Sequence, residues 1–100
     1  MSAESIAKQA VLLVGGDRAT THGDKYTNHH NIAVIWNGIL EAAGKAGVPL
    51  DAHDVANLME GLKIARRYTG VTNMDDYVDG AGYAAVAGEI KEKMDQIKKK

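Results

Sequence analysis

This chain of 100 residues has no cysteine and no phenylalanine, and it contains one proline and one tryptophan. Without cysteine there is neither a disulfide framework nor a thiolate metal site. No long apolar run resembles a signal peptide or a membrane span, so a cytoplasmic protein that does not enter membranes is expected.

An excess of charge of one sign is also missing, because 12 basic and 13 acidic residues leave a formal net charge of −1. Proteins that coat nucleic acids carry a pronounced basic excess, so general nucleic-acid binding is not expected. Any anionic ligand must therefore be bound by a local group of cations.

The low aromatic content limits the core that a single domain spanning residues 1–100 can build. Its interior must come from Ala, Val, Ile, Leu and Met, most of which bury less area per residue than aromatic side chains do. A core of that size is marginal for a monomer of this length. We therefore expect a homo-oligomer.

Helical periodicity recurs in four segments and strand signals are weak, which predicts an all-α fold, a compact bundle of about four helices. Caps and glycines mark the ends of these segments. The expected helices run from Ala3 to Val14, from His29 or His30 to Ala46, from an N-cap at Asp51 to about Tyr68, and from an N-cap at Asn73 to the C-terminal lysines.

Two of these helices show distinctive faces. The second has a broad apolar face, on which Trp36 is expected to pack into the core rather than stack on a base; the face consists of Ile32, Ile35, Trp36, Ile39, Leu40 and Ala43. On the fourth, Gly80, Ala84 and Gly88 recur at four-residue spacing. Glycine inside a helix is costly, so this face is expected to meet another helix, in the same chain or in a second subunit.

Charged residues interrupt apolar faces on the last two helices. Arg66 continues the stripe Val55, Met59, Leu62, and Asp79 begins the stripe Tyr83, Val86, Ile90, Met94, Ile97. Both charges should therefore point inward, where Asp79 can pair with Lys63 or Arg66. This pairing fits a ligand site and also fits a purely structural network.

A line of oxygen donors lies on the fourth helix, since Asp75, Asp79 and Tyr83 follow each other at four-residue spacing. Such oxygens suit Mg²⁺, although two carboxylates are few unless a substrate phosphate adds ligands.

A second candidate region is the polar segment before the second helix, which can hold phosphate through Arg18 and the helix N-terminus. Its candidate ligand-binding residues are Arg18, Thr21, His22, Asp24, Lys25 and Asn28. The alternatives are a solvated connection and, less favoured, a zinc site made by His22, His29 and His30. Adjacent histidines diverge on a helix, which disfavours zinc.

Several motifs resemble a family of short, functionally uncharacterised tailed-phage proteins, over roughly residues 12–87. These motifs are Arg18-x-x-Thr21-His-Gly-Asp24, Asn28, Ile32-Ala-x-Ile-Trp36, Asp54-Val-Ala-x-Leu-Met59, Lys63-Ile-Ala-Arg66 and Asp75-x-x-Val78-Asp79-x-Ala-Gly-Tyr83. More distantly, the carboxylate helix and the all-α layout are similar to MazG-type NTP pyrophosphohydrolases. That family holds Mg²⁺ with Glu-x-x-Glu on one helix and an acidic pair on the next.

The nearest counterpart of Glu-x-x-Glu in this chain is Glu60-x-x-Lys63, where an ammonium group replaces one carboxylate. A cation there would repel Mg²⁺, and it would either neutralise Asp79 or meet a ligand phosphate directly. The resemblance thus implies nucleotide handling, while the substitution argues against hydrolysis.

The leading hypothesis is a phage-type protein, in the host cytoplasm, that binds a phosphorylated nucleotide without a cofactor. The expected pocket combines the 18–28 segment with Lys63, Arg66, Asp75, Asp79 and Tyr83. One alternative is an Mg²⁺-dependent NTP pyrophosphohydrolase with Glu60, Asp75 and Asp79 as metal ligands. A second alternative is a protein-binding inhibitor of a host factor.

Overall fold

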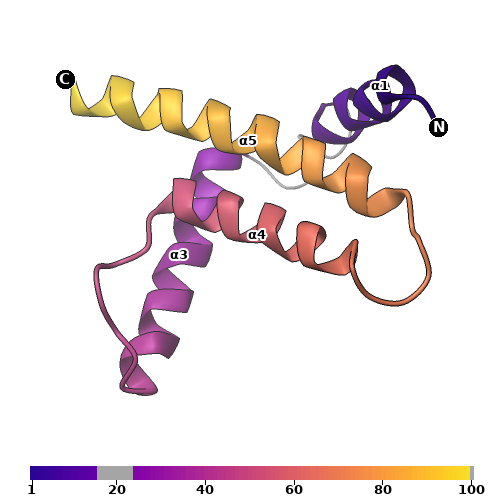
Figure 1. The fold of residues 1–100 in the computed structure, drawn as a ribbon. Coiled ribbons are helices and arrows are strands. Elements are labelled where there is room, and N and C mark those ends of the chain that lie inside the picture. The colour runs from indigo at the N-terminus through magenta and orange to yellow at the C-terminus, as the bar shows by residue number, and fades with distance from the viewer. Residues whose placement is uncertain (16–23, 100) are drawn as a thin grey trace.

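The computed structural model describes residues 1–15 and 24–99. In this part of the chain Figure 1 shows four helices packed together and no strand, which confirms the predicted all-α fold. The helices are α1 (Ala3–Val14), α3 (Lys25–Ala42), α4 (Ala52–Arg66) and α5 (Asp75–Lys98). None of these described helices is long and apolar enough to cross a membrane.

The ends of α1 lie where the sequence predicts them, because both carry clear signals. Ser2 and Ser5 form a capping box at its start, and the N–H of Gly15 closes its end on the carbonyl of Val11. Helix α3 begins earlier than predicted, at Lys25, since the Asp24 side chain caps it. It also ends earlier, at Ala42, just before Gly44, whose φ of +72° lies in the left-handed region.

Helix α4 has the predicted N-cap, Asp51, and it ends at Arg66, four residues before Gly70, which has a φ of +66°. The prediction that Asn73 is the N-cap of α5 is wrong. Met74 occupies that position with helical φ and ψ of −64° and −23° and no side-chain cap. Asn73 still contributes, because its side-chain oxygen accepts a 3.0 Å hydrogen bond from the Asp75 N–H.

Helix α5 is the longest element and contacts the other three helices. Its buried face packs against α4 through small residues, and the buried cluster contains Ala52, Ala56, Val86, Ala87 and Ile90. Gly82 allows α1 to approach, because a Cβ at Gly82 would lie 3.3 Å from Cγ1 of Val14. The core of the described chain is therefore a thin layer in which α5 meets α4 and α1.

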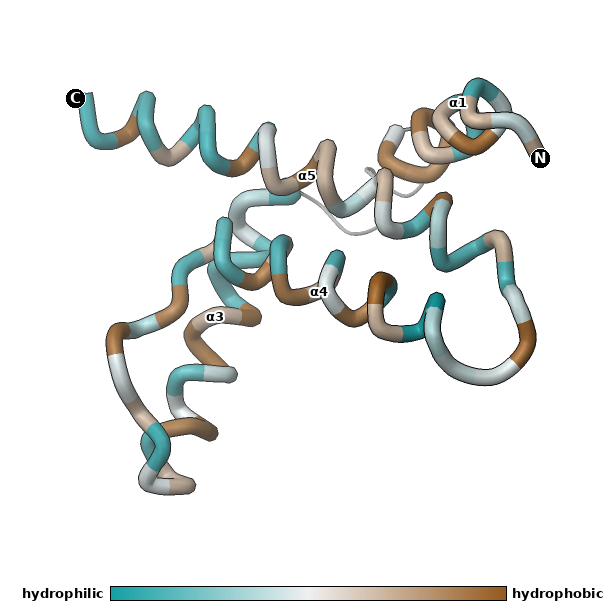
Figure 2. The backbone as a smooth tube through the Cα atoms, in the orientation of Figure 1, coloured by the Kyte–Doolittle hydropathy of each residue, from teal (hydrophilic) through white to brown (hydrophobic). Residues whose placement is uncertain are grey.

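Helix α3 departs from this layer. Its first residues contact α5, and its C-terminal half projects away from that helix (Figure 1). The predicted apolar face is largely in contact with solvent, with Ile35 and Ile39 63% and 61% exposed, and Trp36 is only half-buried. The expectation of a core position for Trp36 is thus not met. Figure 2 shows hydrophobic segments along this projecting helix.

The Asn37 side chain fixes the connection between α3 and α4. Its amide nitrogen donates to the Leu50 carbonyl and its oxygen accepts from the Leu50 N–H, both at 2.9 Å. A single side chain therefore satisfies both backbone groups of Leu50, directly before the Asp51 cap of α4.

Candidate functional site

Opposite charges meet where α4 ends and α5 begins. The last turn of α4 carries Lys63 and Arg66, and the first turn of α5 carries Asp75 and Asp76. Cations at a helix C-terminus and anions at an N-terminus both complement the helix dipole. A short connection joins the end of α4 to the start of α5 (Figure 1). The same preference therefore concentrates charged residues at one end of this helix pair.

The predicted inward ion pair is present. Nζ of Lys63 lies 3.1 Å from Oδ2 of Asp79, and the two side chains are 14% and 29% exposed. Tyr83, one turn further along α5, is half-buried, whereas Asp75 is exposed and does not share this environment. The ion pair therefore unites two of the predicted ligand residues and leaves Asp75 outside.

Arg66 is exposed, and the prediction that it points inward is wrong. The adjacent Arg67 is half-buried instead. A row of buried and half-buried residues runs from Val55 through Met59 and Lys63 to Arg67, the C-cap residue of α4, in steps of four residues. Such a row is the ridge along which a neighbouring helix packs, and it departs gradually from the average period of 3.6 that points to residue 66.

The Arg67 guanidinium is held from several sides. Its Cζ lies 4.5 Å from the centre of the Tyr77 ring, and Nη2 donates a 3.4 Å hydrogen bond to the Asp76 carbonyl. A Cβ at Gly80 would overlap with Nη2, so glycine leaves the space that the guanidinium fills. The Nε group of Arg67 is buried without a hydrogen-bond partner.

Arg67, Asp76 and Tyr77 were missed in the sequence. Asp76 is buried although it stands in the first turn of α5, where an exposed carboxylate is usual. The burial of Arg67 could have been predicted from its spacing, since it follows Lys63 by four residues. The close approach expected at Gly80 is explained by Arg67 in the same chain, whereas Ala84 is exposed and a Cβ at Gly88 would meet nothing within 4 Å.

The other predicted half of the pocket lies elsewhere. Asp24 caps α3 by accepting hydrogen bonds from the N–H and Oγ1 of Thr27, at 2.8 and 2.9 Å. The Thr27 N–H, and to a smaller extent its hydroxyl and nearby Lys93, hold the pKa of Asp24 below its ordinary value of 3.8. Lys25 lies 3.6 Å from Glu89, and Asn28 is exposed. Arg18, Thr21 and His22 lie outside the described residues.

These contacts separate the two predicted halves. Lys25 meets α5 at Glu89, and Lys63 meets it at Asp79. A helix rises about 1.5 Å per residue, so these two positions are about 15 Å apart along α5. The described members of the 18–28 segment therefore do not join Lys63 and Asp79 in one pocket, contrary to the sequence prediction.

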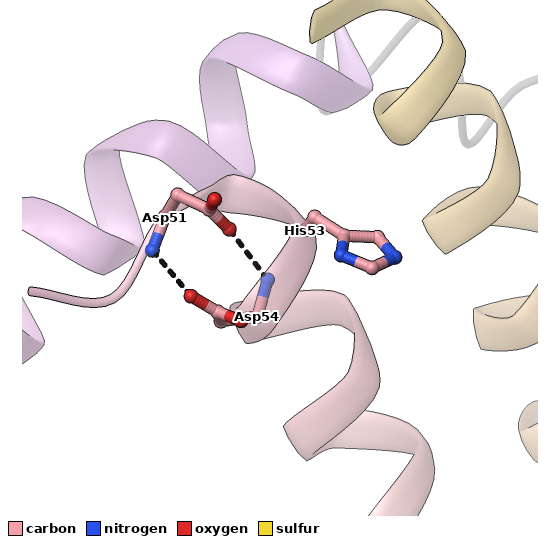
Figure 3. Close-up of side chains that lie close together, drawn as sticks. All are labelled: Asp51, His53 and Asp54. Atoms are coloured by element: carbon pink, nitrogen blue, oxygen red, sulfur yellow. Dashed lines mark hydrogen bonds between the residues drawn. The ribbon is translucent and has the colours of Figure 1, made fainter. Parts of the chain in front are cut away.

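Potential metal ligands converge at another place. Asp51, His53 and Asp54 offer ligand atoms within 4.8 Å of one another. Figure 3 shows that the two carboxylates form a capping box, in which each accepts a 2.9 Å hydrogen bond from the other residue's backbone N–H. Helix capping thus accounts for the two carboxylates, while His53 lies 3.3 Å from the Asn57 amide.

The metal sets that the sequence offered as alternatives do not converge in this way. Among the described residues, Glu60, Asp75 and Asp79 form no comparable group. His29 and His30 diverge, since His29 is buried with Nδ1 2.7 Å from the Lys25 carbonyl, while His30 is exposed.

Residues 5–91 match the family described as Domain of unknown function (DUF6378). The chain belongs to this family. It is 39% identical over 87 residues to the Gene 55 protein of Mycobacterium phage L5, and 36% identical over 89 residues to the Gene 55 protein of Mycobacterium phage D29. The expected similarity to phage proteins is confirmed.

The alignments cover 87% and 89% of the chain, but 53% and 55% of the two phage proteins. The chain therefore spans about half the length of the curated relatives it matches. No solved structure matches it.

Proposed function

We propose that this chain binds a phosphorylated nucleotide without hydrolysing it, and that Arg67 receives a phosphate oxygen. The observation that supports this function is the half-buried guanidinium of Arg67, which Tyr77 and Gly80 hold in place. Its Nε has no hydrogen-bond partner, and an unmet buried donor costs about 1–3 kcal/mol. Because Nε itself is covered, a phosphate oxygen would meet the planar guanidinium from its accessible side.

The surroundings of Arg67 support a preformed binding site. Tyr77 and Gly80 fix the position of the guanidinium, so binding need not order a long flexible side chain. Lys63 lies one turn before Arg67 on the same face of α4 and adds a second cation, although Asp79 partly neutralises it. Tyr77 remains 38% exposed and offers part of an aromatic ring beside the site.

The likeness to MazG-type enzymes supports a nucleotide as the ligand class. In that resemblance Lys63 is the nearest counterpart of a metal-binding carboxylate, and its ammonium group pairs with Asp79. The side chains of Glu60, Asp75 and Asp79 also do not form a metal-binding group among the described residues. Both observations favour binding over metal-dependent hydrolysis. In an infected host, such binding would sequester a nucleotide signal of immunity or serve nucleotide metabolism.

Calorimetry with adenosine and guanosine mono-, di- and triphosphates tests the proposal. Binding is expected in EDTA as well as in Mg²⁺. Arg67→Gln should weaken binding at least tenfold, because a charge-assisted hydrogen bond contributes about 1.5–3 kcal/mol. The neighbouring Arg66→Gln removes the same charge from an exposed position and serves as the matched control. Equal effects of the two variants would remove Arg67 from the binding site.

The same titrations distinguish the two alternative functions. Pyrophosphate release that requires Mg²⁺, and that is lost in folded Asp79→Asn protein, would replace the binder with a pyrophosphohydrolase. If none of the nucleotides binds under either condition, the proposal fails and a protein-binding inhibitor becomes the better hypothesis.

A further inference from the structure

The outer surface of α3 lacks the charges that normally cover an exposed helix. Residues 26–40 contain no Asp, Glu, Lys or Arg, although these four types make up 25% of the chain. Three large apolar side chains on this stretch contact solvent, since Val34, Ile35 and Ile39 are 55%, 63% and 61% exposed. We call these three residues, together with Gly38, the α3 outer face.

The chain also exposes more surface than a folded monomer of its size should. Its accessible surface is 6912 Å². A monomer of 10.7 kDa is expected to expose about 5,500 Å². The excess of about 1,400 Å² per chain exceeds the roughly 800 Å² that each partner buries in a standard interface, and it falls in the range of obligate homodimers.

We infer that the α3 outer face is the contact with a second copy of this chain. A second copy seated on this face would cover part of the surface excess, and obligate homodimer interfaces are apolar in the way this face is. The formal net charge of −1 allows two copies to approach without strong repulsion. A face without charge offers no complementarity to a strongly charged partner, whereas it matches an identical apolar face.

The geometry of α3 suits contact about a two-fold axis. Ile35 and Ile39 form one ridge with a four-residue step, and Val34 and Gly38 form the next. A Cβ at Gly38 would meet nothing within 4 Å in its own chain, so the glycine leaves room for a side chain from outside. With α3 antiparallel to its symmetry mate, the ridge of one copy enters the groove above Gly38 of the other.

Sedimentation velocity from 1 to 100 µM tests this interface. The wild type is expected to sediment as a dimer of twice 10.7 kDa. Ile39→Glu should weaken the dimer by at least about a hundredfold, because two carboxylates would face each other across the axis. The matched control is Leu12→Glu, the same type of change at a 78% exposed position on α1, and it should leave the dimer intact.

A second variant separates loss of the interface from loss of folding. Gly38→Leu meets no obstacle in its own chain, and leucine has a higher helix propensity than glycine. It should therefore keep or increase helicity by circular dichroism while the mass falls to that of a monomer. The urea midpoint of the wild type should rise with protein concentration. A wild type that is monomeric at 100 µM, or a dimer that both Ile39→Glu and Gly38→Leu leave unchanged, would overturn the inference.

Discussion

Replacing Asp79 with alanine should destabilise the protein, because it leaves the ammonium group of Lys63 without its partner. The two groups lie 3.1 Å apart, and their side chains are 14% and 29% exposed. Removing one member of a fully buried pair costs about 3–5 kcal/mol, whereas exposed pairs contribute about 0–1 kcal/mol. The partial exposure of this pair places the expected loss at about 2–3 kcal/mol.

A loss of that size is easily measured in a domain of this length. It corresponds to a fall of about 10–20 °C in the thermal midpoint. Thermal and urea unfolding followed by circular dichroism give the two readouts. The matched control is Asp95→Ala, which breaks the Lys91–Asp95 pair on the same helix, where both side chains are about half exposed. The control carries the same change in helix propensity and should shift stability by less than about 0.5 kcal/mol.

A double variant tests whether the unpaired cation causes the loss. Adding Lys63→Met to Asp79→Ala removes the charge and keeps an apolar side chain of similar length. The double variant should regain about 1 kcal/mol or more relative to Asp79→Ala alone. If Asp79→Ala is no worse than Asp95→Ala, or if the second change recovers nothing, then the pair does not stabilise the α4–α5 contact.

Two further predictions concern glycines and a helix cap. Gly80→Ala should displace the Arg67 guanidinium and weaken nucleotide binding in calorimetry as Arg67→Gln does, whereas Gly88→Ala, which meets open space, should raise stability by about 0.5–1 kcal/mol in urea unfolding. Asp24→Ala should cost about 0.5–2 kcal/mol at pH 7 through loss of the α3 cap. Because the pKa of Asp24 is lower in the folded state, its charged form stabilises the fold above about pH 3.8, and this contribution disappears as the pH falls through the folded pKa. The difference in unfolding free energy between wild type and Asp24→Asn should therefore shrink below that pH, and a difference that is the same at pH 7 and pH 3 would contradict this assignment.

The parts of the fold that the sequence predicts well are those with local chemical signals. Helix α1 is bounded by a serine capping box and a glycine, and its predicted limits are confirmed. The start of α3 was missed because its cap, Asp24, stands inside a long polar segment that conceals the first helical turn. The Asn73 side chain does accept a hydrogen bond from a backbone N–H at the start of α5, that of Asp75, as a capping side chain would. The N-cap position itself is occupied by Met74.

In the candidate site, too, some features could be predicted from the sequence and others could not. The inward position of Asp79 and its pairing with Lys63 follow from helical spacing and from the need of a buried charge for a partner. The sequence predicted that Arg66 points inward, whereas Arg67 is the one that is half-buried. Which of the two is buried depends on which ridge of α4 meets α5, and helical spacing alone does not determine that ridge. The separation of Lys25 from Lys63 depends on where α3 contacts α5, which is a property of tertiary packing.

The clamp between Asn37 and Leu50 divides the connection before α4 into a fixed end and a free part. Residues 43–49 are all exposed, while Leu50 is held through both of its backbone groups. Lengthening the free part adds only a logarithmic entropy cost, about 0.6 kcal/mol for each doubling of the loop. Insertions between Lys45 and Val48 should therefore be tolerated, because they leave the backbone bond from Lys45 to Leu40 at the end of α3 and the position of Asp51 at the start of α4 unchanged. This connection is the place where the chain can change in length without disturbing the contact between α4 and α5.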